Sequence, residues 1–193
     1  MEEIILEDKQ AMIFLNNLGS STFDPFWILV SEKWFWIPLY VIFLYFLYKN
    51  FNKKSLFYIL LFVALGITAS DQIANIFKFG FERLRPCHDP SLEGLLREVK
   101  CGGKFGFYSA HSSNSFFVAT YLTILLGKKI KQLPYFLFVW AAIVAYSRVY
   151  LGMHFPGDII VGAIMGILLA LFFGTLAKKS SKSQKLQLMT HNF

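Results

Sequence analysis

Five long runs of uncharged, mostly apolar residues constrain the fold of this chain more than any other feature. The runs cover residues 34–48, 55–70, 105–127, 132–147 and 159–177. A helix that crosses a bilayer needs about 20 mostly apolar residues, a length that the shorter runs reach with their flanking residues. Only 16% of the chain is charged, whereas an average soluble domain is about a quarter charged. We therefore predict an all-α, integral membrane helical bundle of about five transmembrane helices.

The same composition excludes several other classes of protein. Hydrophobic residues make up 55% of the chain, which excludes disorder, and two cysteines cannot form a disulfide-rich scaffold. The net charge of +7 alternates with the apolar runs instead of forming one basic face on a soluble body. We therefore predict a membrane environment and no nucleic-acid partner. No obligatory protein partner is evident.

The lysines predict how the bundle is oriented. If the five spans alternate in direction, ten lysines fall on one side, which the positive-inside rule makes cytoplasmic. These are Lys49, Lys53, Lys54, Lys128, Lys129, Lys131, Lys178, Lys179, Lys182 and Lys185. Nine basic residues fall on the other side, so the bias appears only when Lys78, Arg85 and Arg148 are assigned to a functional site. We therefore expect a bacterial inner-membrane protein whose loop 78–108 faces the periplasm or the exterior.

The two ends of the chain are predicted to lie outside the bundle. Residues 8–31 contain two apolar stretches, and Asp24-Pro25 has the form of a helix start, with Asp as the cap and Pro at the first position. We interpret this region as two helices in the outer interface, with a sixth span beginning near Met12 as the alternative. The acidic N-terminus lacks the basic region of a cleavable signal peptide. Residues 1–177 then form one domain, and residues 178–193 a polar, disordered cytoplasmic tail.

Polar residues gather at the predicted outer ends of the spans, where they need an explanation because charge inside a bilayer is costly. They form three clusters: Lys78 with Arg85-Pro86, then Tyr108-Ser109-Ala110-His111, then Ser147-Arg148 with His154 and Asp158. The alternating topology puts all three clusters on the same side of the membrane. Five packed spans would let them converge.

The first property of these clusters is an affinity for phosphate. Lys78, Arg85 and Arg148 supply positive charge, and Arg can hold a phosphate through two parallel hydrogen bonds. Ser109 and the backbone N–H groups of Ala110 and His111 lie where a span begins, and helix N-termini bind anions. We therefore predict that these residues hold a phosphoryl group.

The second property is nucleophilic chemistry. Pro156 fits the first turn of the last span, so His154 precedes that helix, and Asp158 is near enough to hold one nitrogen of its ring. An imidazole held in this way exposes its other nitrogen for attack, and His111 can protonate the leaving oxygen. No spare pair of carboxylates is present to bind Mg²⁺. We therefore expect catalysis without a metal or a cofactor.

The three clusters resemble the signature of the type-2 phosphatidic-acid phosphatase superfamily, whose motifs are K-x6-R-P, P-S-G-H and S-R-x5-H-x3-D. The matching residues are Lys78, Arg85 and Pro86, then Ser109 and His111, then Ser147, Arg148, His154 and Asp158. The chain departs from the second motif at Tyr108, which replaces Pro, and at Ala110, which replaces Gly. The motifs span residues 78–158.

The resemblance implies a helical membrane bundle that hydrolyses a lipid phosphate without metal, through a phosphohistidine. The substrate stays open among undecaprenyl diphosphate, phosphatidylglycerophosphate, phosphatidic acid and a lipid A phosphate, and we favour undecaprenyl diphosphate as a generic bacterial role. A lipid phosphotransferase with the same intermediate is the enzymatic alternative. The non-enzymatic alternative is a transporter of anionic lipids, which would not need two histidines and an aspartate at this spacing.

Two features beside the first cluster carry further expectations. Cys87 and Cys101 lie in the outer loop, where an oxidising compartment favours a disulfide over two free thiols. Asp71 shares a helix face with Lys78. For Asp71 we favour a structural pairing with a basic residue of the site, and a direct role in catalysis is the alternative.

Small and aromatic residues within the spans are interpreted as packing and anchoring groups. Gly162 and Gly166 form a G-x-x-x-G step, for which we favour tight packing inside the bundle over a dimer contact. The aromatic residues of the first span are expected to anchor it at the interface. They are Trp34, Trp36, Tyr40, Tyr45 and Tyr48.

Overall fold

The structure, a computed structural model, describes residues 2–190, with side chains through residue 181. Its α-helices are α1 (Glu2–Asn17), α2 (Asp24–Ser31), α3 (Ile37–Asn50), α4 (Lys53–Phe81), α5 (Ala110–Leu126), α6 (Leu133–Tyr150) and α7 (Pro156–Thr190). Three short 3-10 helices are η1 (Lys33–Trp36), η2 (Pro86–His88) and η3 (Pro90–Leu92). Within residues 2–190 there is no β-strand, only an isolated bridge between Leu84 and Phe105. The all-α prediction is confirmed.

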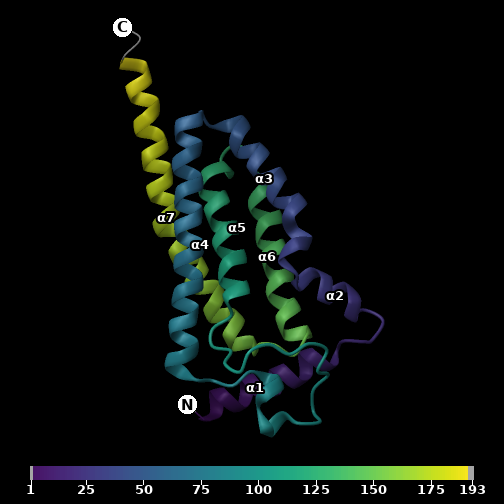
Figure 1. Cartoon of the computed structure of the whole chain (residues 1–193). Helices are drawn as coiled ribbons and strands as arrows, with labels where there is room; N and C mark the ends of the chain where they lie inside the picture. The colour runs from purple at the N-terminus through teal and green to yellow at the C-terminus, as the bar shows by residue number, and fades with distance from the viewer. Residues whose placement is uncertain (1, 191–193) are drawn as a thin grey trace.

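Helices α4 to α7 run alternately along the molecule and bring the three predicted clusters to one end of the bundle (Figure 1). We call this the site end; it also carries α1 and the loop between α4 and α5. Helix α5 contacts α4, α6 and α7, and ten of its 17 residues are buried. Helix α3 packs beside α6, where Trp140 meets the rings of Trp36 and Phe43 edge to face. The central position of α5 places its N-terminus in the middle of the site end.

Two glycines let α7 lie against the backbone of α5. A Cβ atom on Gly162 would lie 2.6 Å from the carbonyl oxygen of Ser109, and one on Gly166 would overlap the carbonyl of Ser113. Any larger residue would therefore push the two helices apart. The G-x-x-x-G step packs within the bundle, as we expected.

Among the described helices, three are long and apolar enough to cross a membrane: α4, α6 and the segment Pro156–Ser181 of α7. Helix α2 and the segment Lys33–Asn50 pass the same test together, with a bend of 73° between them, and would add a fourth span. Helix α5 is shorter than its apolar run, because Ser109 caps the helix and residues 105–109 belong to the preceding loop. The predicted count of about five spans therefore stays a prediction.

The N-terminal region forms two helices, as predicted, but its contacts differ from expectation. Helix α1 starts before residue 8 and is tied to the site end by Asn16, whose amide donates to the carbonyl of Tyr150 at 2.8 Å. Asp24 does not cap α2; Phe23 occupies the cap position, and the Asp24 carboxylate accepts hydrogen bonds from Arg97 and Tyr150 instead. A cation and a hydroxyl from other elements thus replace the backbone N–H as partners of this carboxylate.

The structure also differs from the predicted disorder of the C-terminal tail. Helix α7 continues to Thr190, and no Gly or Pro follows Gly174 to end it. Residues 191–193 lie outside the described part of the chain.

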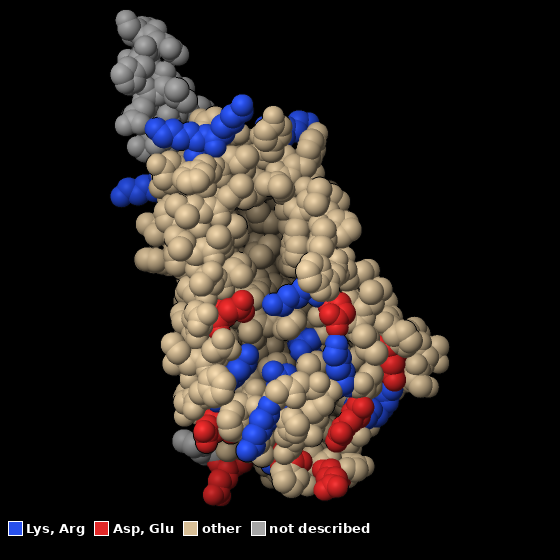
Figure 2. All heavy atoms as spheres, in the orientation of Figure 1, with Lys and Arg blue, Asp and Glu red and all other residues tan. Residues whose placement is uncertain are grey.

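Charged residues are separated along the bundle. In the view of Figure 2, the end opposite the site shows Lys and Arg without Asp or Glu, the site end shows both signs, and a broad uncharged band lies between them. The turn from α3 to α4 and the turn from α5 to α6 lie at the end opposite the site. These turns and the helix ends beside them carry six of the ten lysines assigned above to the cytoplasm. This arrangement agrees with the alternating topology predicted from the sequence.

Candidate active site

The three sequence clusters meet in one cavity of about 440 Å³ at the site end. Six of the eight predicted catalytic and phosphate-binding residues line it: Lys78, Arg85, Ala110, His111, Arg148 and His154. The other two, Ser109 and Asp158, are fully buried beside these lining residues. Residues from α4, α5, α6, α7 and two loops thus form a single site, which we call the phosphate cavity.

Two buried arginines give the phosphate cavity its positive charge. Arg148, in the last turn of α6, donates from one Nη to the Ser31 hydroxyl, and its buried Nε has no hydrogen-bond partner. Arg85 donates from Nε to the carbonyl of Phe105 at 3.2 Å. Burial lowers the pKa of Arg85, and the carboxylate of Asp158 opposes part of that effect. Because guanidinium groups stay protonated in proteins, both side chains offer charge and donors to a bound anion.

The loop between α4 and α5 holds Arg85 in place. Cys87 and Cys101 form a disulfide, with their Cα atoms 5.9 Å apart. The backbone N–H of Arg85 donates to the carbonyl of Lys104 at 3.1 Å. A Cβ atom on Gly102 would lie 2.6 Å from an Nη of Arg85, so glycine is what lets the loop approach this closely.

A group of side chains with the spacing of metal ligands lies at the disulfide of this loop. Within residues 2–181, whose side chains are described, one group of side chains has metal-ligand spacing: Cys87, His88 and Cys101. Its two sulfur atoms are already joined in the disulfide, so they are not available as thiolate ligands. The group also lies outside the lining of the phosphate cavity.

The N-terminus of α5 forms a second part of the anion site. The Ser109 hydroxyl accepts a hydrogen bond from the backbone N–H of Ser112 at 3.5 Å. The backbone N–H of Ser109 donates to the backbone carbonyl of Asp158 at 3.1 Å. The first N–H groups of a helix lack partners within the helix, and Ala110 and His111 lie in this first turn. The helix begins at Ala110 in place of the motif's Gly, so this substitution leaves the helix start intact.

His154 and Asp158 form the centre of the site. The Nδ1 atom of His154 lies 3.5 Å from Oδ2 of Asp158, and the two side chains are 2% and 0% exposed. The same Oδ2 accepts a hydrogen bond from the N–H of Phe155 at 3.0 Å. Burial, reinforced by the charges of Arg85 and Arg148, holds the pKa of His154 well below its ordinary value. The imidazole is therefore neutral at physiological pH, and its Nδ1 is turned toward the carboxylate.

Sequence reasoning missed two residues that support this pair. Arg83 donates to Oδ1 of Asp158 at 2.8 Å and to Oδ2 of Asp8, on α1, at 2.6 Å. Its guanidinium also lies 4.2 Å from the centroid of the Phe155 ring. The other oxygen of Asp8 accepts the N–H of Gly157 at 2.8 Å. A chain of contacts therefore runs from α1 through Arg83 to Asp158 and His154.

Asp71 is placed differently from the prediction. Its Oδ1 accepts a hydrogen bond from the side-chain amide of Asn114 at 2.9 Å. In the described part of the chain, Asp71 forms no ion pair with Lys78 or any other base. The prediction of a structural ion pair is therefore wrong, because the Asp71 carboxylate accepts its hydrogen bond from Asn114 on α5.

Comparison with known proteins gives the same family as the motifs. The family model of the PAP2 superfamily matches residues 56–182. A lipid A 4'-phosphatase from Bacteroides thetaiotaomicron is 39% identical over 163 residues, which are 82% of this chain and 72% of that protein. A lipid A 4'-phosphatase from Porphyromonas gingivalis is 35% identical over 178 residues, which are 89% of this chain and 73% of that protein.

A solved structure shares the fold. The crystal structure of a transmembrane PAP2-type phosphatidylglycerolphosphate phosphatase from Bacillus subtilis superposes with a TM-score of 0.72. It is 22% identical and covers 93% of this chain and 88% of its own. The similarity at this level of identity establishes the helical membrane bundle.

The fold, the three converging motifs and the family match define an integral membrane phosphatase, and the chain belongs to the PAP2 superfamily. It is a lipid phosphatase. The predicted fold class and enzyme class are confirmed.

Proposed function

We propose that this phosphatase works through a covalent phosphohistidine on His154, without a metal ion. The observation that carries the proposal is the setting of His154: its ring lines the phosphate cavity, and its Nδ1 lies 3.5 Å from Asp158. A neutral imidazole turned in this way presents Nε2 to the cavity. Arg85 and Arg148 hold the phosphoryl group against that nitrogen.

The reaction has two steps. In the first, Nε2 of His154 attacks phosphorus, the P–O bond to the lipid breaks, and His111 gives its proton to the leaving oxygen. In the second, His111 takes a proton from a water molecule whose oxygen attacks phosphorus; the P–Nε2 bond breaks, and phosphate and neutral His154 are released. Lys78, the two arginines and the start of α5 stabilise the charge on the equatorial oxygens in both steps.

We further propose a phosphate monoester on a glycolipid of the lipid A type as the substrate. Two relatives that align with more than 80% of this chain are lipid A 4'-phosphatases. This similarity favours such a substrate over the undecaprenyl diphosphate that we expected from the sequence. The lysine distribution supports a location of the phosphate cavity at the outer leaflet, which is part of the proposal.

Phosphate release from purified protein in detergent micelles tests the proposal. The substrates are lipid A, phosphatidylglycerophosphate, phosphatidic acid and undecaprenyl diphosphate. We expect the highest kcat/KM with lipid A, no loss of activity in EDTA, and inhibition by orthovanadate, which mimics the five-coordinate transition state.

Each part of the proposal can fail separately. A loss of activity in EDTA that Mg²⁺ restores would overturn metal-independent catalysis. A higher kcat/KM with undecaprenyl diphosphate would overturn the substrate assignment. A transfer of the phosphoryl group to a second lipid, without release of phosphate, would favour the phosphotransferase instead.

A further inference from the structure

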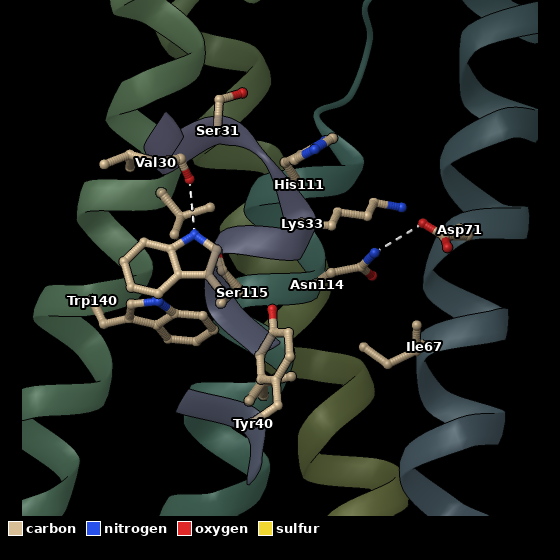
Figure 3. A pocket seen from close by; sticks show the side chains of 13 residues that line it. Val30, Ser31, Lys33, Tyr40, Ile67, Asp71, His111, Asn114, Ser115 and Trp140 are labelled. Carbon is tan, nitrogen blue, oxygen red and sulfur yellow. Dashed lines mark hydrogen bonds between the residues drawn. The ribbon is translucent and has the colours of Figure 1, made fainter. Parts of the chain in front are cut away.

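A second cavity lies beside the phosphate cavity. It has a volume of about 320 Å³ and is bounded by α2, η1, α3, α4, α5 and α6 (Figure 3). Apolar side chains form a large part of its wall: Val30, Trp36, Ile67, Val118, Trp140 and Val144. In Figure 2 the surface is hollowed where the uncharged band meets the charged residues of the site end. An apolar cavity at this depth suits a hydrocarbon chain of the substrate.

Four residues line both cavities and form a neck between them. They are Lys33, Asp71, His111 and Asn114. In the mechanism above, His111 protonates the oxygen that leaves with the lipid. Any substrate with its phosphate in the first cavity and its chain in the second must therefore place the unit that joins them inside the neck.

The neck presents hydrogen-bond acceptors as well as a cation. The Asn114 amide donates to Asp71 at 2.9 Å, and its oxygen is buried without a hydrogen-bond partner. Figure 3 shows Lys33 extending from η1 toward Asn114 and Asp71. Of the ion pairs within residues 2–181, none includes Lys33. The neck thus offers a carboxylate, an unpaired amide oxygen and a free ammonium to the same bound group.

We infer that the neck selects the unit that carries the scissile phosphate, and that this unit is uncharged and bears O–H or N–H donors. A sugar or a glycerol has this chemistry; a second phosphate does not. A hydroxylated unit would satisfy the oxygen of Asn114 and donate to Asp71. A second phosphate could pair with Lys33, but it would be repelled by Asp71 and, having no donor, would leave the oxygen of Asn114 unpaired. The inference rests on the proposed function and adds Lys33, Asp71 and Asn114 as residues that determine specificity.

The test measures kcat/KM for three substrates in one detergent: lipid A, phosphatidylglycerophosphate and undecaprenyl diphosphate. We expect the wild type to prefer the first two. Asp71→Asn keeps the size of the side chain and removes its charge, so it should shift the ratio toward the diphosphate by about tenfold. Asn114→Leu should lower kcat/KM for the hydroxylated substrates by a similar factor and leave the diphosphate unaffected. Glu93→Gln, an exposed carboxylate in the outer loop, is the control and should leave all ratios unchanged.

The outcomes separate this inference from the proposed function. A substrate ratio that stays at the wild-type value in both neck variants would overturn the inference, with phosphatase activity intact. Failure of the wild type to release phosphate from all three substrates would overturn the proposed function instead. Between the two hydroxylated substrates, a preference for lipid A identifies a sugar in the neck, and a preference for phosphatidylglycerophosphate identifies a glycerol.

Discussion

The proposed chemistry depends on one histidine, His154, that is kept neutral among cations. His154 is 2% exposed, and it lies at the junction of α6 and α7. Desolvation disfavours its protonated form, and the nearby charges of Arg85, Arg148 and Lys78 act in the same direction. The cations that we propose to bind phosphate therefore also keep the proposed nucleophile unprotonated.

The depressed pKa of His154 predicts the acid limb of the pH profile. Protonation removes the nucleophilic lone pair, so phosphohistidine formation should persist well below pH 6.5, about the ordinary pKa of a histidine. Arg85→Gln removes one positive neighbour, so the pKa of His154 should rise and the acid limb should move to higher pH. Single-turnover rates at saturating substrate, measured as a function of pH, give the acid limb of the wild type and that of Arg85→Gln. The substrate is the same for the two enzymes, so its own titration does not differ between them. An acid limb that stays at the wild-type pH in Arg85→Gln would therefore contradict the assignment of this limb to His154.

Most site residues were predictable at this scale because few residue types can do the chemistry. His111, His154 and Asp158 stood out as ionisable groups next to apolar runs, and Arg85 and Arg148 as forked donors. Asp71 was misjudged because its partner, Asn114, is 43 residues away on another helix. A helix-face argument finds only neighbours on the same helix.

At the scale of elements, α1 supports the site from outside the motifs. Asp8 on α1 contacts both Arg83 and the backbone of Gly157, at the start of α7. The spacing between Asp8 and Gly157 is 149 residues, and no local pattern connects them. The acidic N-terminal segment therefore gave no sequence signal for the contacts of Asp8. The helices, in contrast, could be predicted from hydrophobic runs and from Pro at helix starts.

Removal of the charge of Asp8 should lower turnover through Arg83 and Asp158. Asp8→Asn keeps an oxygen for the N–H of Gly157 but loses the ionic partner of Arg83, so we expect kcat to fall by about tenfold, or ~1.4 kcal/mol, with KM nearly unchanged. Asp8→Glu should recover most of the rate. The measurement is steady-state phosphate release.

A neighbouring residue on α1 provides the control for this prediction. Lys9→Gln removes an ion pair with Asp89, 2.7 Å long, that ties the same helix to the outer loop. This pair has no contact with Arg83, so kcat should stay close to that of the wild type. An equal loss of kcat in Lys9→Gln would mean that α1 acts through general stability and not through Arg83.

At the scale of the whole molecule, the bundle separates a lysine-rich end from the site end. Alternating spans and the positive-inside rule predicted this separation, and the structure places the three motifs together at one end (Figure 1). The 73° bend between α2 and η1–α3 was not predictable, because it depends on how this pair packs against α6. That bend brings Lys33 and Ser31 to the site.

The orientation can be measured with single cysteines. In a background with Cys87→Ala and Cys101→Ala, Leu95→Cys lies in the loop at the site end and Lys128→Cys at the opposite end, and both positions are exposed. A membrane-impermeant thiol reagent on intact cells should label position 95 and not position 128. Labelling at position 128 alone would invert the topology and place the site at the cytoplasmic leaflet.

The central claim is that the phosphoryl group passes through His154. Purified protein is mixed with lipid substrate carrying a ³²P-labelled phosphate and quenched within the first turnover. We expect a label that is stable in base and lost in acid, mapped to the peptide of His154. It should form more slowly in Asp158→Asn and be absent from His154→Ala, whose phosphate release should fall roughly 10⁴-fold or more with folding intact. Label on another residue, or wild-type turnover by His154→Ala, would contradict the account.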